Sequence, residues 1–148
     1  SGAVRGDRFL QIGLRGYFSE LCESISASMI ADTSHFSLAA DVDGSTVDAR
    51  VSVSLGLIVT ELVINALKHA FPDNRREGTI LVSFRSAGTG WILTVDDDGV
   101  GFPVSPSGEV AVKPGLGTGI VEALARQLDA AVSITGANPG TRVAVTHD

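Results

Sequence analysis

Hydrophobic residues recur at helical spacing in three segments of the chain. We expect the first helix to run from about Arg15 to Ile30. The second runs from about Val51 to Phe71, and Pro72 stops it because proline cannot continue a helix. The third follows a glycine-rich stretch and has an aliphatic residue at every fourth position, namely Leu116, Ile120, Leu124 and Leu128.

Alternation of apolar with polar residues predicts five strands. One covers Phe36 to Val42. Two more, over residues 79–85 and 91–97, form a hairpin across a loose loop, SAGTG. The last two cover residues 131–135 and 141–146. The order helix, strand, helix, two strands, helix, two strands indicates an α+β fold, a two-layer sandwich with a helical layer on a largely antiparallel sheet.

Composition narrows the class of protein. With 148 residues, 44% hydrophobic and 19% charged, the chain is expected to form one compact globular domain. A net charge of −6 without a basic stripe argues against nucleic acid as the main partner. No apolar run approaches the length of a membrane span, and no leader segment opens the chain. The single Cys22 excludes an internal disulfide and a cysteine metal cluster, and favours a reducing, cytoplasmic setting.

The second helix carries a polar stripe on an otherwise apolar surface. At about 100° per residue, Glu61, Asn65, Lys68 and His69 lie within about 100° of one another. Flanking aliphatic residues make a free solvent face an unattractive explanation, and polar groups in such a place are costly unless they are paired. The alternative is an ordinary amphipathic surface helix.

The segment VDDDGVG, residues 95–101, follows a core strand. Asp97 shares a strand face with Leu93 and Val95, so we expect its carboxylate to point inward, where it can accept a hydrogen bond from a buried amine. Asp96 falls on the opposite face. Gly99 and Gly101 allow a sharp turn and the close approach of a ligand. The alternative is a simple acidic turn after a strand.

Glycines at 115, 117 and 119 precede the third helix. Free backbone N–H groups at a helix start favour an anionic phosphate, although the stretch matches neither the P-loop nor the dinucleotide fingerprint. It could equally be a flexible turn. Near the end of the chain, Thr141 shares a strand face with Val143 and Val145, so its hydroxyl should face inward. An ordinary threonine at the start of a strand is the alternative.

Taken in order, E61-L-V-x-N65-x-x-K68-H69-A70, D97-D-G99-V-G101, G115-L-G117-T-G119 and G140-T141 resemble the four boxes of the Bergerat (GHKL-type) ATP-binding fold. That superfamily includes gyrase-type ATPases, heat-shock chaperones, mismatch-repair ATPases and the histidine kinases of two-component signalling. The residues in these boxes are most similar to those of bacterial sensor histidine kinases related to the HWE class. Thr60 precedes Glu61 where that class has a histidine, and the tryptophan–glutamate pair is missing, so the chain resembles a sister subclass.

The resemblance implies that ATP and Mg²⁺ are the cofactors. Asn65 would bind the metal through its amide oxygen, and Glu61 would order metal-bound water or polarise the incoming nucleophile. Lys68 and His69 would reach phosphate oxygens.

The resemblance also implies that Asp97 accepts the adenine amino proton, with Thr141 in support. Gly99 and Gly101 would open space beside the base. A lid would close over the phosphates, and its implied nucleotide-binding residues are Lys113, Gly115, Leu116, Gly117, Thr118 and Gly119. Lys113 could instead be a solvated loop lysine. We expect residues 103–114 to be mobile without nucleotide.

None of His35, His69 and His147 lies in a long amphipathic helix pair of the kind that presents a phosphoacceptor histidine in this family. We therefore expect a catalytic domain, residues 31–148, preceded by a helical segment, residues 1–30, that continues from an upstream phosphoacceptor domain. The implied partners are that dimerisation domain and a response regulator, in a homodimeric parent protein for which a membrane anchor stays open. The domain itself would be cytoplasmic, without membrane contact.

Three other readings of the same pocket stay open from the sequence. An anti-sigma-factor serine/threonine kinase has a similar pocket and size, and it would need a serine-bearing protein substrate. A degenerate phosphorelay docking domain would be expected to lose pocket residues, whereas Asn65 and Asp97 are present. A gyrase-like hydrolase is the least favoured, because it needs a second domain to supply a lysine.

Overall fold

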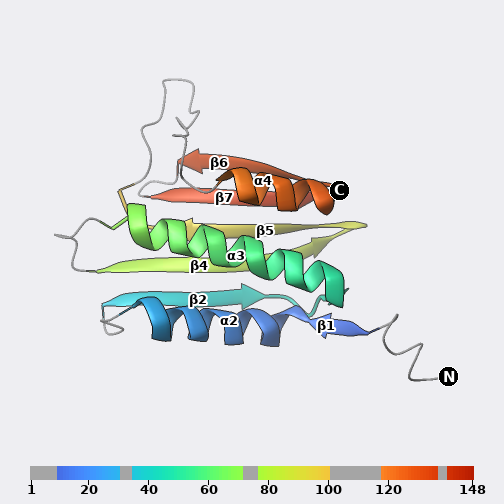
Figure 1. The fold of residues 1–148 in the computed structure, drawn as a ribbon, viewed down its shortest axis with the longest axis horizontal. Helices are drawn as coiled ribbons and strands as arrows, with labels where there is room; N and C mark the ends of the chain where they lie inside the picture. Colours follow the sequence, from blue (N-terminus) through green and yellow to red (C-terminus); the bar gives the residue numbers. More distant parts are fainter. Residues whose placement is uncertain (1–9, 31–34, 72–76, 101–117, 137–139) are drawn as a thin grey trace.

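The computed structural model describes residues 10–30, 35–71, 77–100, 118–136 and 140–148. Three helices, α2 (Leu14–Met29), α3 (Ala49–His69) and α4 (Thr118–Gln127), form one layer. They cover one face of a five-stranded sheet with the strand order β2-β4-β5-β7-β6 (Figure 1). Its strands are β2 (Phe36–Val42), β4 (Gly78–Ala87), β5 (Gly90–Asp97), β6 (Ala130–Gly136) and β7 (Thr141–His147).

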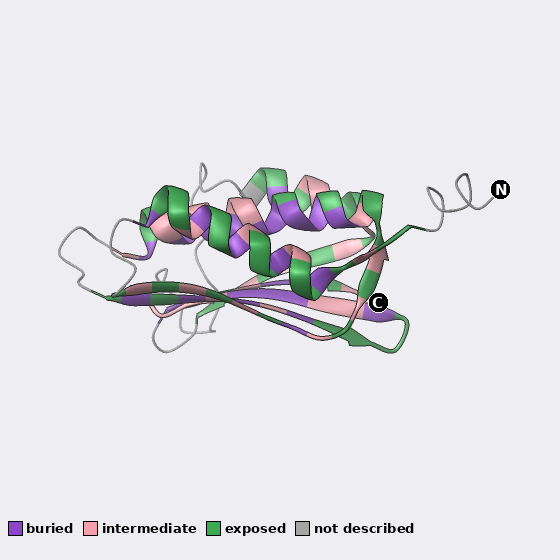
Figure 2. Cartoon of the chain, turned by 90° about the horizontal axis from the view of Figure 1, so that it is seen from below, coloured by how far each residue is buried: buried purple, intermediate pink, exposed green. Residues whose placement is uncertain are grey.

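Only the β2–β4 pair of this sheet is parallel, and the other three pairs are antiparallel. The predicted α+β class, with helices on one face of a mostly antiparallel sheet, is confirmed. Figure 2 shows the buried sides of the helices turned toward the sheet. The core forms between α3 and the central strands, where Val82, Leu93 and Val145 are 0% exposed. A β-strand alternates its side chains between two faces, so the opposite face carries polar residues such as Ser83 and Asp96 together with the apolar Leu81 and Ile92.

The first helix shares this core. Phe18 of α2 is fully buried and meets Phe84 of β4 edge to face, with ring centroids 6.2 Å apart. A side chain at Gly56 of α3 would collide with the Tyr17 hydroxyl, so the glycine is what lets α2 and α3 approach closely. Burial raises the pKa of the Cys22 thiol to about 11, which agrees with a packing role for this residue.

Helix α3 needs one correction to the sequence analysis. Its 21 residues are apolar enough, by length and composition, to cross a membrane, and no other described helix meets that test. The structure lays α3 across the sheet, with Leu55, Ile58 and Val59 completely buried. Its high hydropathy is therefore that of a core helix, because one side packs on the sheet and its flanks contact α2 and α4.

Two short strands escaped the sequence analysis. β1 (Gln11–Gly13) and β3 (Thr46–Asp48) pair antiparallel, and three residues are too few to show alternation. β3 leads into α3, where the carboxylate of Asp48 accepts the Val51 N–H at 2.9 Å and caps the helix start. This cap explains why α3 begins at Ala49, two residues earlier than predicted.

The β4–β5 hairpin is tighter than the loose loop that we predicted. Ala87 pairs with Gly90, which leaves a two-residue turn. Gly88 has a φ of +61°, a conformation that two-residue hairpins require at their first central position and that glycine adopts without strain. The strands therefore extend further than the polar letters of SAGTG suggested.

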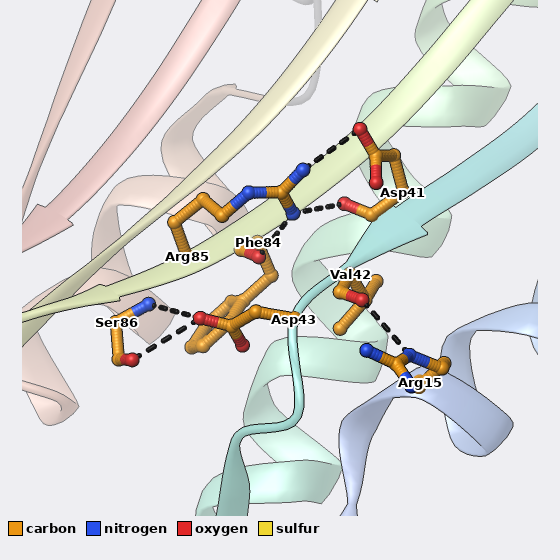
Figure 3. A network of polar contacts seen from close by, with 7 residues as sticks. All are labelled: Arg15, Asp41, Val42, Asp43, Phe84, Arg85 and Ser86. Atoms are coloured by element: carbon orange, nitrogen blue, oxygen red, sulfur yellow. Dashed lines mark hydrogen bonds and ion pairs between the residues drawn. The ribbon is translucent and has the colours of Figure 1, made fainter.

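At the end of β2, a polar network ties this strand to β4 (Figure 3). The Asp43 carboxylate accepts hydrogen bonds from the backbone N–H and the hydroxyl of both Ser45 and Ser86. These donors lower the pKa of Asp43 to about 2, with the Ser45 hydroxyl as the main cause. Arg85 pairs with Asp41 at 2.8 Å, and Arg15 of α2 donates to the Val42 carbonyl at 3.1 Å.

Candidate nucleotide-binding site

Asp97 lies at the end of β5, on the sheet face that carries the buried Leu93 and Val95. Burial raises the pKa of its carboxyl group, and the neighbouring acids add to this effect. Backbone N–H groups of Gly99 and Thr141 oppose the shift, the first donating to Oδ1 at 3.0 Å. The inward direction predicted from strand phase is thus the one that the structure has. A desolvated carboxylate held by backbone amides is suited to accept a proton donor from a ligand.

The three consecutive acids have three different environments. Asp96 points to the opposite sheet face and pairs with Arg142 at 2.5 Å, as its strand phase predicted. Asp98 accepts the Thr79 N–H at 2.8 Å and donates its own N–H to the Thr79 carbonyl. Within the described part of the chain, no three acidic, histidine or cysteine side chains gather as a metal cluster. Among the three acids, only Asp97 remains for a ligand on the helix side of the sheet.

Gly99 makes a close approach, but to α3. A side chain at this position would collide with the carbonyl oxygen of Ala70, at the end of the helix. The next residue, Val100, donates its N–H to the same oxygen at 2.9 Å. From the sequence we expected Gly99 to open space beside a ligand. In the structure, the direction in which its side chain would point is filled by the helix end.

Gly140, which belongs to the fourth sequence box without a role of its own, lies against Asp97. Its φ is +98°, and a side chain there would collide with the Asp97 carbonyl oxygen. The glycine lets the start of β7 approach Asp97 closely enough for the Thr141 N–H to reach the carboxylate. Thr141 is only 4% exposed, in agreement with its predicted inward direction. The glycine that precedes a buried threonine was the available signal.

The polar stripe lies on the second half of α3. Glu61 and Asn65 are half-buried, whereas Lys68 and His69 in the last turn are exposed. The positive charge of Lys68 at this helix end is also favourable for the helix dipole. The expected aliphatic flanks are uneven, because Ile58 is fully buried while Leu57 is 50% exposed. The stripe is therefore more open to solvent than we predicted, most of all at its C-terminal end.

The end of α3, the end of β5 and the start of β7 gather at one end of the molecule, together with the start of α4 (Figure 1). α4 begins at Thr118 and turns Val121 and Ala125 into the core beside α3, while Gly119 is exposed. Gly101, Lys113, Gly115, Leu116 and Gly117 lie outside the described residues, as does the lid prediction for residues 103–114. Figure 1 thus places the elements that carry the expected base residues, Asp97 and Thr141, and the expected metal residue, Asn65, at the same end of the fold.

The chemistry of these donors fits a magnesium nucleotide. Mg²⁺ usually takes one or two protein oxygens and fills its shell with phosphates and water. Asn65 and Glu61 offer an amide and a carboxylate oxygen one helical turn apart on a half-buried face. Asp97, at the end of β5, offers a desolvated carboxylate as a hydrogen-bond acceptor at the same end of the fold.

The three histidines lie in unrelated places. His69 is in the last turn of α3, and His35 precedes β2 in a turn. His147 ends β7, where its ring stacks on Trp91 with centroids 5.6 Å apart. None of the three is presented on a pair of long helices in the described part of the chain.

A layer of helices over a mixed sheet, with an inward acid and a polar helix stripe at one end, is the arrangement expected of a Bergerat-type ATP-binding domain. The profile of the family described as "Histidine kinase-like ATPase domain" matches residues 25–146. The chain belongs to this family.

Similar sequences include a histidine kinase and a sensor protein. The chain is 35% identical to Blue-light-activated histidine kinase 2 of Erythrobacter litoralis over 105 residues, which cover 70% of this chain and 30% of that protein. It is 29% identical to the sensor protein LytS of Staphylococcus saprophyticus, over 97% of this chain and 25% of LytS. The chain thus spans less than a third of the length of these two relatives.

Solved structures agree on the fold. A blue-light activated histidine kinase of Erythrobacter litoralis superposes with a TM-score of 0.78 and 27% identity, over 91% of this chain and 41% of that one. The histidine kinase AdeS of Acinetobacter baumannii superposes with a TM-score of 0.71 over 92% of this chain and 64% of that one. Its 16% identity supports the fold alone.

Proposed function

We propose that this chain is the ATP-binding catalytic domain of a two-component sensor histidine kinase. It would bind Mg-ATP and transfer the γ-phosphoryl group to a histidine on an adjacent dimerisation domain. The observation that carries the proposal is Asp97, an inward carboxylate that is desolvated at the end of a core strand and held by the amides of Gly99 and Thr141. Such an acceptor is suited to the exocyclic amine of adenine.

The residues have distinct roles in this proposal. Asp97 accepts the adenine amino proton, and Thr141 supports it. Asn65 holds the metal through its amide oxygen, while Glu61 orders water or polarises the nucleophile. When bound, Mg²⁺ supplies the positive charge that lets a domain of net charge −6 hold a triphosphate. Phosphoryl transfer asks the protein mainly for positioning and charge neutralisation.

Lys68 and His69, both exposed at the end of α3, would reach phosphate oxygens. The lid residues, which include Lys113, would close over the phosphates, with Gly115, Gly117 and Gly119 as hinges. Gly119 is exposed in the first turn of α4, which supports a phosphate position near this helix start.

The parent protein in this proposal is a longer, multidomain kinase. In support, the chain covers 30% or less of a histidine kinase and of a sensor protein to which it is similar. We infer that residues 1–30 continue from an upstream phosphoacceptor and dimerisation domain, that the parent is a homodimer, and that it phosphorylates a response regulator. The domain would work in the cytoplasm without nucleic-acid or membrane contact. The sister-subclass assignment stays a prediction.

Two measurements test the proposal. Calorimetry should show ATP binding that Mg²⁺ strengthens, and Asn65→Ala should remove the metal-dependent part while leaving metal-free binding nearly unchanged. With γ-labelled ATP and a protein that includes the upstream helices, the label should appear as acid-labile phosphohistidine. Acid-stable phosphoserine would instead support the serine-kinase alternative, and absence of nucleotide binding would support a docking domain.

A further inference from the structure

The carbonyl group at the C-cap of α3 has its hydrogen-bond partner on another element. A helix leaves its final carbonyl groups without partners inside the helix, and they must be satisfied from elsewhere. Ala70 follows α3 as its C-cap and is 7% exposed. Its carbonyl oxygen accepts the Val100 N–H at 2.9 Å, so the helix is capped by the turn that follows Asp97.

Gly99 makes this cap possible. A side chain on Gly99 would collide with both the carbonyl oxygen and the methyl group of Ala70. Gly99 is buried, although its φ is not in the left-handed region. The reason for glycine here is therefore space for the helix end and not backbone conformation.

Both partners are also anchored to the start of β4. Asp98, between Asp97 and Gly99, exchanges two hydrogen bonds with Thr79. Phe71, the residue after Ala70, packs its ring over Gly78, where a side chain would collide with it, and meets Phe36 at 5.6 Å. The end of α3, the turn after β5 and the start of β4 thus close a triangle of contacts.

Within that triangle, two functional positions are joined by a short path. Asn65 is five residues before Ala70 on the same helix, and Asp97 is two residues before Gly99. Displacement of the helix end by the bulk of one methyl group would change the spacing between the metal-binding amide and the base-binding acid. Misplacement of about 1 Å is enough to lose about two orders of magnitude in a site that acts by positioning.

We propose that the Ala70–Gly99–Val100 contact is a positioning device that sets the distance between Asn65 and Asp97, so that base and metal are bound as one unit. This inference rests on the proposed function. It assigns Ala70 and Gly99 a role in coupling the two ends of the ligand, and no direct contact with it.

The test is a double-mutant cycle on the metal effect, defined as the ratio of ATP dissociation constants without and with Mg²⁺. Gly99→Ala should lower this ratio by about tenfold. In an Asn65→Ala background the same substitution should lower it no further. Gly44→Ala is the matched control, because a side chain at Gly44 meets nothing within 4 Å.

A second readout needs no ligand. Amide hydrogen exchange at Val100 should accelerate in Gly99→Ala and stay unchanged in Gly44→Ala, since only the first displaces the acceptor oxygen. Should Gly99→Ala fail to fold, Ala70→Gly removes the facing methyl group without adding bulk. It should lower the metal ratio by about threefold and accelerate the same amide.

The outcomes are distinguishable. A Gly99→Ala protein that loses ATP affinity equally with and without Mg²⁺, or that loses the metal ratio again in the Asn65→Ala background, overturns the positioning device and leaves the proposed function intact. A metal ratio that Asn65→Ala does not change overturns the metal assignment, and the device with it. Ala70→Gly with wild-type ratio and exchange also overturns the device.

Discussion

Two aspartates at opposite ends of the sheet show what separates a structural carboxylate from one held for a ligand. Asp43, beyond the end of β2, receives two hydrogen bonds from each of two serines, and its pKa is lowered to about 2. Asp97, at the end of β5, has two backbone donors, yet burial raises its pKa above the ordinary value. At Asp43 the chain itself satisfies the charge. At Asp97 the effect of burial on the pKa exceeds the opposing effect of the two backbone hydrogen bonds.

The direction of a carboxylate's pKa shift therefore indicates whether it serves the fold or a ligand. A carboxylate with a lowered pKa stabilises the fold in its charged form. One with a raised pKa makes the ligand-free fold less stable at neutral pH, and a protein retains such a group where a ligand supplies the missing partner. The same side chain thus has opposite thermodynamic signs at the two ends of one domain.

The largest effect is expected from Asp97→Asn. It should weaken ADP binding by about 100-fold, since hydrogen bonds to charged groups contribute about 1.5–3 kcal/mol. The ligand-free variant should be as stable as the parent or more stable, because the desolvated charge is gone. Calorimetry and thermal unfolding measure the two effects. A loss of stability together with a loss of binding would assign Asp97 to the structural class of Asp43.

Gly140→Ala should be the next largest, and it acts on the fold. The position combines a φ of +98° with a collision against the Asp97 carbonyl oxygen, so we expect a loss of about 2–3 kcal/mol in the free energy of unfolding. Chemical denaturation measures the loss. Gly44→Ala, in a turn near Asp43, should change stability by less than about 0.5 kcal/mol. Similar losses for both variants would contradict the close approach of β7 to Asp97.

Asp43→Asn should destabilise the fold at neutral pH by about 1 kcal/mol, a value reduced for solvent exposure. Because the folded pKa of Asp43 is below the unfolded one, its contribution is complete above about pH 4 and is lost as the pH falls through about 2. The variant should therefore show a shallower loss of stability in that window. For Asp97 the sign is opposite, since its folded pKa is raised and the fold gains from protonation as the pH falls. We would measure the free energy of unfolding of Asp43→Asn and Asp97→Asn between pH 2 and 7. Relative to the parent protein, its pH dependence on the acid side should change in opposite directions in the two variants, and a change in the same direction would contradict the comparison.

The features that the sequence predicted correctly are set by residues that lie close together in the chain. Strand phase separates Asp97 from Asp96 within a few residues, and the structure places Asp96 on the outer face beside Arg142. Helical periodicity likewise predicted the polar stripe of α3 from residues one turn apart. These local periodicities depend on backbone geometry alone, so they survive folding unchanged.

The rest depends on contacts between distant residues. Asp43 received no role from the sequence, because its second pair of donors comes from Ser86, 43 residues later. β1 pairs with β3 across more than thirty residues. The collision that demands glycine at Gly99 involves Ala70, on another element. No periodicity reports such pairings, and a glycine signals only that something comes close, without saying what.

The smallest effect sharpens the comparison within three adjacent residues. Asp96→Asn should change the free energy of unfolding by less than about 0.5 kcal/mol, because its partner Arg142 is largely exposed and surface ion pairs contribute little. ADP affinity should change by less than about threefold, since the side chain lies on the opposite face of the sheet from Asp97. Asp96 also raises the pKa of Asp97 through charge repulsion, so its neutralisation should, if anything, favour the charged acceptor. Calorimetry beside Asp97→Asn gives the contrast, and comparable losses from both variants would mean that strand phase does not decide which acid binds the base.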